Sequence, residues 1–217
     1  MNEGGLTRPI RVVVLLSGRG SNFQAIVEAQ LPIDIVAVIS NRPQAAGLAY
    51  ARERGLTAVA FDHTQHPDRA AFDALLADEI ERQRPDLVVL AGYMRILSPA
   101  FIARFEGRLL NIHPSLLPMF PGLRTHEQAL AEGVKIHGCT VHFVTAQLDH
   151  GPIVVQAAVP VRADDTPDTL AARVLAQEHR IYPQAIRWFA EGRLVNAHGR
   201  VNLKDDLTSQ SVLSPGT

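Results

Sequence analysis

The stretch IRVVVLLSGRGSNFQAIVEAQ, residues 10–30, runs from an apolar segment through two glycines into a helical pattern. Residues 10–16 are mostly β-branched and show little polar alternation, which predicts a strand buried on both faces. Apolar side chains recur on one helical face over residues 22–30, and residues 34–40 form a second short apolar run. This order predicts a βαβ unit.

The alternation of strands and helices continues along the chain. Strands are predicted over residues 57–61, 86–93 and 108–113, and helices over residues 45–55 and 69–83 and from Ser98. Parallel strands need crossover connections, which helices supply. The sequence therefore predicts an α/β fold in which a mostly parallel sheet carries helices on both faces.

The pattern changes after residue 135. Apolar runs at residues 138–144 and 152–161 are separated by a polar loop, residues 145–151. This spacing predicts an antiparallel pair of strands joined by a flexible loop, a candidate lid or binding element.

A long helix is predicted over residues 166–192. Thr166 is its expected cap and Pro167 its first residue, because proline fits the first turn of a helix. Pro183 lies inside this segment, so we expect the helix to be kinked or broken there.

Length and composition limit the class of protein. With 217 residues, 21 Lys and Arg and 22 Asp and Glu, the chain suits one domain and lacks the positive charge expected of a nucleic-acid-binding protein. The single Cys139 cannot form an internal disulfide, which indicates a cytoplasmic setting, and no apolar run reaches the roughly 20 residues of a membrane span. We predict a flexible leader (residues 1–9), one domain (10–201) and a disordered tail (202–217).

The glycine turn SGRGSN, residues 17–22, lies between a predicted parallel strand and a helix start, where free N–H groups and the helix dipole favour an anion. Phe23 occupies the place of the third glycine of a dinucleotide-binding turn, and the second strand ends in Ser40 and Asn41 without an acidic residue. No lysine follows the glycines, as a P-loop requires. A phosphate monoester fits best. The alternative is a tight turn without a ligand, in which Ser21 or Asn22 only caps the helix.

Two polar residues interrupt the apolar strand in RLLNIHPSLLP, residues 108–118. Side chains alternate along a strand, so Asn111 and His113 share one face. Pro114 keeps His113 extended and leaves both side chains at the carboxyl end of the strand, where open α/β sheets bind ligands. A neutral amide and a titratable imidazole suit a developing oxyanion and its protons. The alternative for His113 is a core histidine that bonds to a neighbouring group.

The segment NIHPSLLPMFPG, residues 111–122, resembles the signature of the folate-dependent formyltransferase family. SGRGSN, LAGYMRILSP (residues 90–99), HGCTVHFVT (137–145) and DHGPI (149–153) follow the family order, and the resemblance covers residues 10–195. It implies a Rossmann-like formyltransferase fold and transfer of the formyl group of 10-formyltetrahydrofolate to the amine of a phosphoribosylated glycinamide in purine biosynthesis. The implied partners are these small molecules, with no nucleic acid, membrane or metal, and the implied state is a monomer or homodimer.

The resemblance also implies roles for individual residues. Asn111 and His113 would be the catalytic pair that donates to the tetrahedral intermediate, and Asp149 would hold the imidazolium and help move the proton. The residues implied to bind the substrate are Gly20, Ser21 and Asn22 at its phosphate and Glu178 at its ribose hydroxyls or amine side. The residues implied to bind the folate are Met94, Arg95, Ile96, Leu97 and Asn111, with Arg69 near its benzoyl-glutamate part and Leu148 in the loop over the pterin. Two positions depart from the family pattern, Tyr93 in place of phenylalanine and His150 in place of glycine.

Other functions fit parts of the same pattern. Formyltetrahydrofolate hydrolase shares the core motif but normally carries an N-terminal regulatory domain, and methionyl-tRNA formyltransferase normally adds a basic C-terminal domain. A non-catalytic folate- or nucleotide-binding module on the same fold is a third alternative. A zinc hydrolase could use His113, His126, His137 and Asp149, although the sequence offers no close helical histidine pair.

Overall fold

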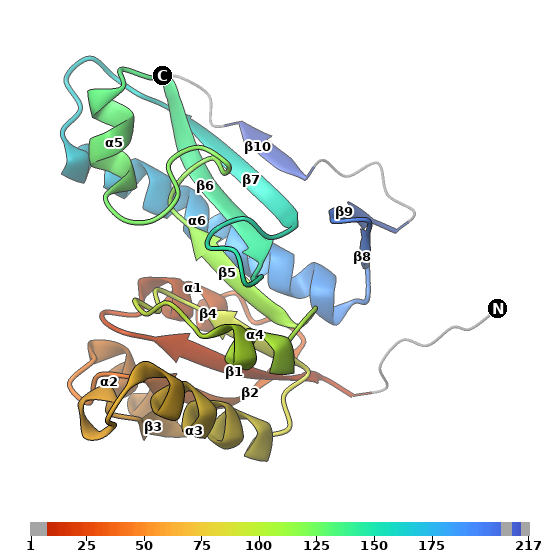
Figure 1. The fold of residues 1–217 in the computed structure, drawn as a ribbon. Coiled ribbons are helices and arrows are strands. Elements are labelled where there is room, and N and C mark those ends of the chain that lie inside the picture. The colour runs from red at the N-terminus through yellow and green to blue at the C-terminus, as the bar shows by residue number, and fades with distance from the viewer. Residues whose placement is uncertain (1–7, 205–209, 214–217) are drawn as a thin grey trace.

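The computed structural model describes residues 8–204 and 210–213, which form one large sheet covered by helices (Figure 1). The strands are β1 (Ile10–Leu16), β2 (Ile33–Ser40), β3 (Ala58–Ala60), β4 (Leu87–Leu90), β5 (Leu109–His113), β6 (Ile136–Phe143), β7 (Ile153–Pro160), β8 (Leu194–Ala197), β9 (Arg200–Leu203) and β10 (Ser211–Leu213). The helices are α1 (Ser21–Glu28), α2 (Ala46–Glu53), the 3-10 turn η1 (His63–Gln65), α3 (Arg69–Arg82), α4 (Pro99–Arg104), α5 (Thr125–Ala131) and α6 (Pro167–Ala190).

The main sheet has eight strands in the order β10-β7-β6-β5-β4-β1-β2-β3. Strands β3, β2, β1, β4 and β5 run parallel, whereas β6 pairs antiparallel with β5 and β7 antiparallel with β6. The chain thus has a mostly parallel sheet with an antiparallel C-terminal portion, and the predicted fold class is confirmed. Strands β8 and β9 form a separate antiparallel hairpin.

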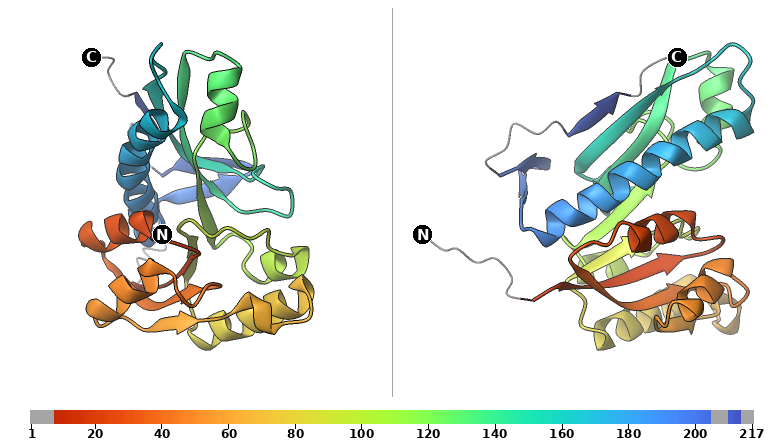
Figure 2. Two further views of the ribbon diagram at one scale, coloured as in Figure 1. Left: turned by 90° about the vertical axis from the view of Figure 1, so that its left-hand side faces the viewer. Right: turned by 180° about the vertical axis from the view of Figure 1, so that it is seen from behind.

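The side chains of β1 show why its sequence is apolar almost throughout. Val12 and Val14 enter the hydrophobic cluster shared with α1, α2 and α6, and Val13 and Leu15 enter the cluster shared with α3 and α4. Figure 2 shows these two groups of helices on opposite faces of the sheet. A strand covered on both faces has no polar face to alternate with.

Helix α6 is not broken at Pro183, one of the two outcomes predicted there, because it continues through this residue (Figure 2). Proline inside a helix costs about 3 kcal/mol in lost hydrogen bonding and steric conflict. Packing offsets this cost: Pro183 is buried, and the hydroxyl of the neighbouring Tyr182 lies 3.0 Å from the carbonyl oxygens of Leu90 and Leu110. Tyr182 therefore ties the middle of the helix to β4 and β5.

The C-terminal region also differs from the predicted tail of residues 202–217. Val201 to Leu203 belong to β9, and Ser211–Leu213 pair in parallel with β7. Residues 1–7, 205–209 and 214–217, and the leader and tail predictions that fall on them, lie outside the described residues. Within the described ranges no helix is long and apolar enough to cross a membrane.

Candidate active site

The carboxyl end of β5 holds the pair that the sequence singled out. The antiparallel register places Asn111 opposite His142 of β6, and the Asn111 Nδ2 atom lies 3.2 Å from His142 Nε2. The other ring nitrogen, Nδ1, lies 2.9 Å from the carbonyl oxygen of Phe143. Since a carbonyl oxygen only accepts, Nδ1 carries the proton, and Nε2 accepts a hydrogen bond from the Asn111 amide.

Burial also lowers the pKa of His142, so its ring stays neutral at physiological pH. A neutral ring with its proton on Nδ1 can only accept at Nε2. The nitrogen of the Asn111 amide is therefore fixed toward His142, with one N–H still unpaired among the described residues. The Asn111 side chain lines a cavity next to the sheet, where this N–H is available as a donor.

His113 is buried, with 5% of its surface exposed, and both ring nitrogens face oxygen atoms. Nε2 lies 3.0 Å from the carbonyl oxygen of Phe120, and Nδ1 lies 3.5 Å from Asp149 Oδ2. Both contacts are favourable when both nitrogens carry protons. The Phe120 carbonyl oxygen thus already occupies one ring nitrogen of His113, and the Asp149 carboxylate faces the other.

Asp149 lies in the loop between β6 and β7. Its backbone φ is 49°, in the left-handed region that aspartate tolerates better than most residues. Its Oδ2 atom accepts a hydrogen bond from the Gly122 N–H at 2.8 Å and faces His113. The structure thus brings Asn111, His113 and Asp149 together, as the sequence predicted for the candidate catalytic set.

Most of the predicted folate residues line the same cavity. The cavity has a volume of about 110 Å³, and its lining includes Arg95, Ile96, Leu97, Leu148, Asn111 and Asp149. Tyr93 also lines it. Ile96 and Leu148 are more than half exposed, which leaves apolar surface for a flat ring. Met94 and Arg69 do not line this cavity: Met94 is exposed beside it, and Arg69 begins α3.

The glycine turn precedes α1 with Gly20 as the N-cap residue, at a left-handed φ of 76°. No side chain caps the helix, so neither Ser21 nor Asn22 has the capping role that the alternative gave it. Asn22 instead donates from Nδ2 to Glu178 Oε2 at 2.6 Å. Burial raises the pKa of Glu178, and the bond from Asn22 opposes this rise. The first N–H groups of α1 stay available for an anion.

Comparison with known proteins decides the family. The family model described as formyl transferase matches residues 10–186. The chain belongs to the formyl transferase family. The family predicted from the sequence motifs is confirmed.

Relatives of this formyl transferase include the phosphoribosylglycinamide formyltransferase of Escherichia coli (strain K12), which is 52% identical over 85% of this chain and 89% of that protein. A crystal structure of glycinamide ribonucleotide transformylase 1 from Symbiobacterium toebii is also 52% identical, with a TM-score of 0.89 over 94% of this chain and 99% of that one. A formyltetrahydrofolate deformylase from Pseudomonas syringae pv. tomato str. DC3000 shares the fold at 27% identity and a TM-score of 0.86, over 92% of this chain and 67% of that one.

His142 is the site residue of this formyl transferase that sequence reasoning missed. In HGCTVHFVT it looks like one more core position of an apolar strand. The signal that could have identified it is the strand register, which the sequence leaves open. Only the antiparallel pairing of β5 with β6 shows that His142 faces Asn111.

The histidines of the zinc alternative have a different arrangement. His126 and His137 pack edge to face with ring centroids 5.2 Å apart, and Phe120 packs against His137. Within residues 8–204 and 210–213, no group of three or more histidine, cysteine or acidic residues is placed to hold a metal ion.

Proposed function

We propose that this formyl transferase moves the formyl group of 10-formyltetrahydrofolate to the primary amine of 5-phosphoribosylglycinamide, as the names of its relatives indicate for those proteins. The observation that carries the proposal is the Asn111 amide, oriented by His142 inside a cavity whose wall includes Asp149. We place this activity in the cytoplasm, with a monomer or homodimer as the expected state.

The reaction needs a donor for the oxygen of the formyl group. When the amine attacks the formyl carbon, a C–N bond forms and the carbonyl oxygen gains negative charge. The unpaired N–H of Asn111 stabilises this charge and needs little reorganisation, because His142 already holds the amide. The bond between the formyl carbon and the folate nitrogen then breaks.

The proton balance falls to His113 and Asp149. The attacking nitrogen must lose a proton, and the leaving folate nitrogen must gain one. His113 and Asp149, with atoms 3.5 Å apart, can hold this proton between the two steps. Before a proton can leave from Nε2 of His113, the hydrogen bond from this atom to the Phe120 carbonyl oxygen must break. No cysteine or serine nucleophile takes part, so transfer is direct.

The two substrates approach from opposite sides of Asn111. The phosphate of one binds the N–H groups at Gly20, Ser21 and Asn22, and its ribose meets Glu178, whose carboxylate Asn22 already holds. The folate lies along residues 94–97 with its pterin under Leu148. Both positions are supported by the free helix start and by the exposed apolar rim of the cavity.

The test follows the absorbance of the formylated folate with and without phosphoribosylglycinamide. Consumption that depends on the amine supports the proposal, whereas consumption without the amine indicates the hydrolase. Asn111→Ala should slow transfer by roughly a hundredfold or more, because one oxyanion donor is worth on the order of 3 kcal/mol. A formylated enzyme trapped after mixing with the folate alone would contradict direct transfer.

A further inference from the structure

One buried residue, Ser17, joins the bases of the two loops proposed to bind the substrates. The first is the glycine turn, residues 17–22, and the second is the folate loop, residues 91–97, which carries residues proposed to bind the folate. The Ser17 N–H donates to the Gly92 carbonyl oxygen at 3.1 Å, and the Met94 N–H donates to Ser17 Oγ at 2.8 Å. Two hydrogen bonds of opposite direction thus hold the glycine turn against the folate loop.

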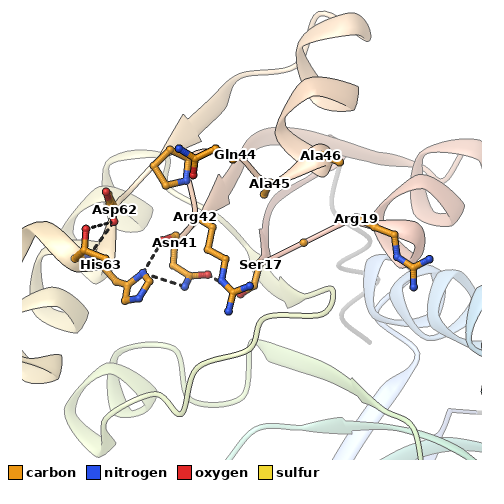
Figure 3. Close-up of a pocket in the computed structure, with 12 residues that line it drawn as sticks. Ser17, Arg19, Asn41, Arg42, Gln44, Ala45, Ala46, Asp62 and His63 are labelled. Atoms are coloured by element: carbon orange, nitrogen blue, oxygen red, sulfur yellow. Dashed lines mark hydrogen bonds between the residues drawn. The ribbon is translucent and has the colours of Figure 1, made fainter. Parts of the chain in front are cut away.

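A third partner fixes the direction of the Ser17 hydroxyl. Since a backbone N–H only donates, the hydroxyl accepts from Met94 and directs its own hydrogen to Asn41 Oδ1, 2.5 Å away. Figure 3 shows the Ser17 and Asn41 side chains turned toward each other. Ser17 is 2% exposed and Asn41 3%, so little water reaches either group. The hydroxyl therefore has one orientation, in which it accepts from the folate loop.

The glycine turn is closely packed on its other side as well. The Gly18 carbonyl oxygen accepts from the Gly47 N–H at 3.1 Å, and a Cβ atom on Gly20 would lie 3.1 Å from the Cα atom of Gly47. The start of α2 therefore leaves the turn little room to move away from the folate loop. A displacement at the base of either loop should be passed on to the other through these backbone contacts.

We propose that Ser17 is a positioning residue for formyl transfer. Through Met94 it sets the place of the folate loop relative to the glycine turn, and thereby the distance between the attacking amine and the formyl carbon. The inference rests on the proposed function, which puts the phosphate of one substrate at residues 20–22 and the folate along residues 94–97. Ser17 itself is not among the residues proposed to touch either substrate.

The effect should appear in the rate of transfer more than in the binding of either substrate. Direct transfer needs the reacting atoms about 3 to 3.5 Å apart, and a misplacement of about 1 Å can cost on the order of a hundredfold in rate. Ser17→Ala removes the acceptor for the Met94 N–H but keeps the backbone bond to Gly92. We therefore expect kcat to fall about 10- to 50-fold, while the dissociation constant of each substrate alone changes by less than about threefold.

The experiment combines steady-state kinetics with calorimetric binding of 10-formyltetrahydrofolate alone and of phosphoribosylglycinamide alone, so that no turnover occurs. Ser40→Ala is the matched control, because Ser40 is fully buried and its Oγ atom also accepts from a backbone N–H, that of Arg42 at 3.1 Å. Ser40 has no hydrogen bond to the folate loop among the described residues, so this variant should lose thermal stability to a similar extent and keep its kcat.

Asn41→Ala provides a second variant that leaves Ser17 in place. It removes the acceptor that directs the Ser17 hydroxyl, so it should lower kcat in the same way as Ser17→Ala but by less. Because its effect is expected in kcat and not in binding, this variant decides the question if Ser17→Ala does not fold.

The outcomes separate the positioning role from the reaction itself. Absence of formyl transfer by the wild-type protein overturns the proposed function. Transfer by the wild type together with unchanged kcat in Ser17→Ala, or in Asn41→Ala if only that variant folds, overturns the positioning role alone. An equal loss of kcat in Ser40→Ala also overturns it, as does a loss that appears only as weaker binding of one substrate.

Discussion

Replacing His142 by phenylalanine tests whether the orientation of the Asn111 amide matters for catalysis. The substitution keeps an aromatic ring in a buried position and removes the nitrogen that accepts from Asn111 at 3.2 Å. A neutral hydrogen bond contributes about 1 kcal/mol net, and a complete oxyanion donor about 3 kcal/mol. Loss of orientation should cost about 1 to 2 kcal/mol, in the lower part of this range, so we expect kcat to fall roughly 5- to 30-fold, less than for Asn111→Ala.

The assay is steady-state kinetics over a range of pH, with KM measured for both substrates. His142→Gln provides a conservative variant, because its amide oxygen can accept from Asn111 and should recover part of kcat. The pH profile should keep its position around neutral pH in every variant, since burial lowers the pKa of His142 and its ring is already neutral there. Fluorescence of the single Trp188, which is buried, reports whether each variant is folded.

Two results would refute this reasoning. A folded His142→Phe variant with wild-type kcat would show that Asn111 needs no orientation by this ring. Equal loss in His142→Phe and His142→Gln, together with a shifted pH profile, would show that His142 itself exchanges protons in the reaction.

Three further changes test other parts of the structure. Gly20→Ala should lower the free energy of unfolding by about 1 to 2 kcal/mol, because Gly20 has a φ of 76° and an added Cβ would lie 3.1 Å from the Cα atom of Gly47. The control in thermal unfolding is Gly18→Ala, because an added Cβ there would meet open space. Glu178→Gln should raise KM for the phosphoribosyl substrate, and an unchanged KM would exclude a substrate contact. The same variant should be more stable than the wild type at neutral pH. The pKa of Glu178 is raised in the folded state, so the wild type loses stability as pH rises from the unfolded-state pKa toward the folded-state pKa. Burial lowers the pKa of His137 from 6.5 to about 4, so the native state binds fewer protons than the unfolded state between these pH values. The free energy of unfolding should therefore decrease as pH falls through this window, by an amount on the order of 2 to 3 kcal/mol. His137→Gln should reduce this acid sensitivity in denaturant unfolding, and a pH dependence identical to that of the wild type would contradict the prediction.

Local sequence predicted the elements whose formation depends on neighbours in the chain. The run at residues 10–16 and the glycine turn behind it specify a strand and a helix start within one short segment, and β1 and α1 form there. The strand expected over residues 86–93 ends at Leu90, because Gly92 turns the chain with a φ of 74°. The Ser17 N–H then donates to the Gly92 carbonyl oxygen, a contact that joins two distant loops.

The elements that were not predicted depend on partners far away in the sequence. Residues 211–213 form β10 because the edge of β7 offers unpaired backbone groups, and nothing in Ser-Val-Leu alone predicts that pairing. α5 is short, with seven residues, and its packing against α6 comes from the tertiary structure. The Asn22–Glu178 bond spans 156 residues, so only the packing of α1 against α6 reveals it.

The change from parallel to antiparallel pairing at β5 explains why the site forms where it does. A parallel neighbour would need another crossover helix, whereas antiparallel β6 returns directly and places His142 opposite Asn111. The loop after β6 leaves the sheet beside Leu110 and folds back across β5, so that Asp149 reaches His113. On the other side, parallel β4 ends in the loop that carries the residues proposed to bind the folate. The proposed site is thus completed from both sides of β5, because β6 supplies His142 and, through the loop after it, Asp149, whereas β4 leads into the proposed folate residues.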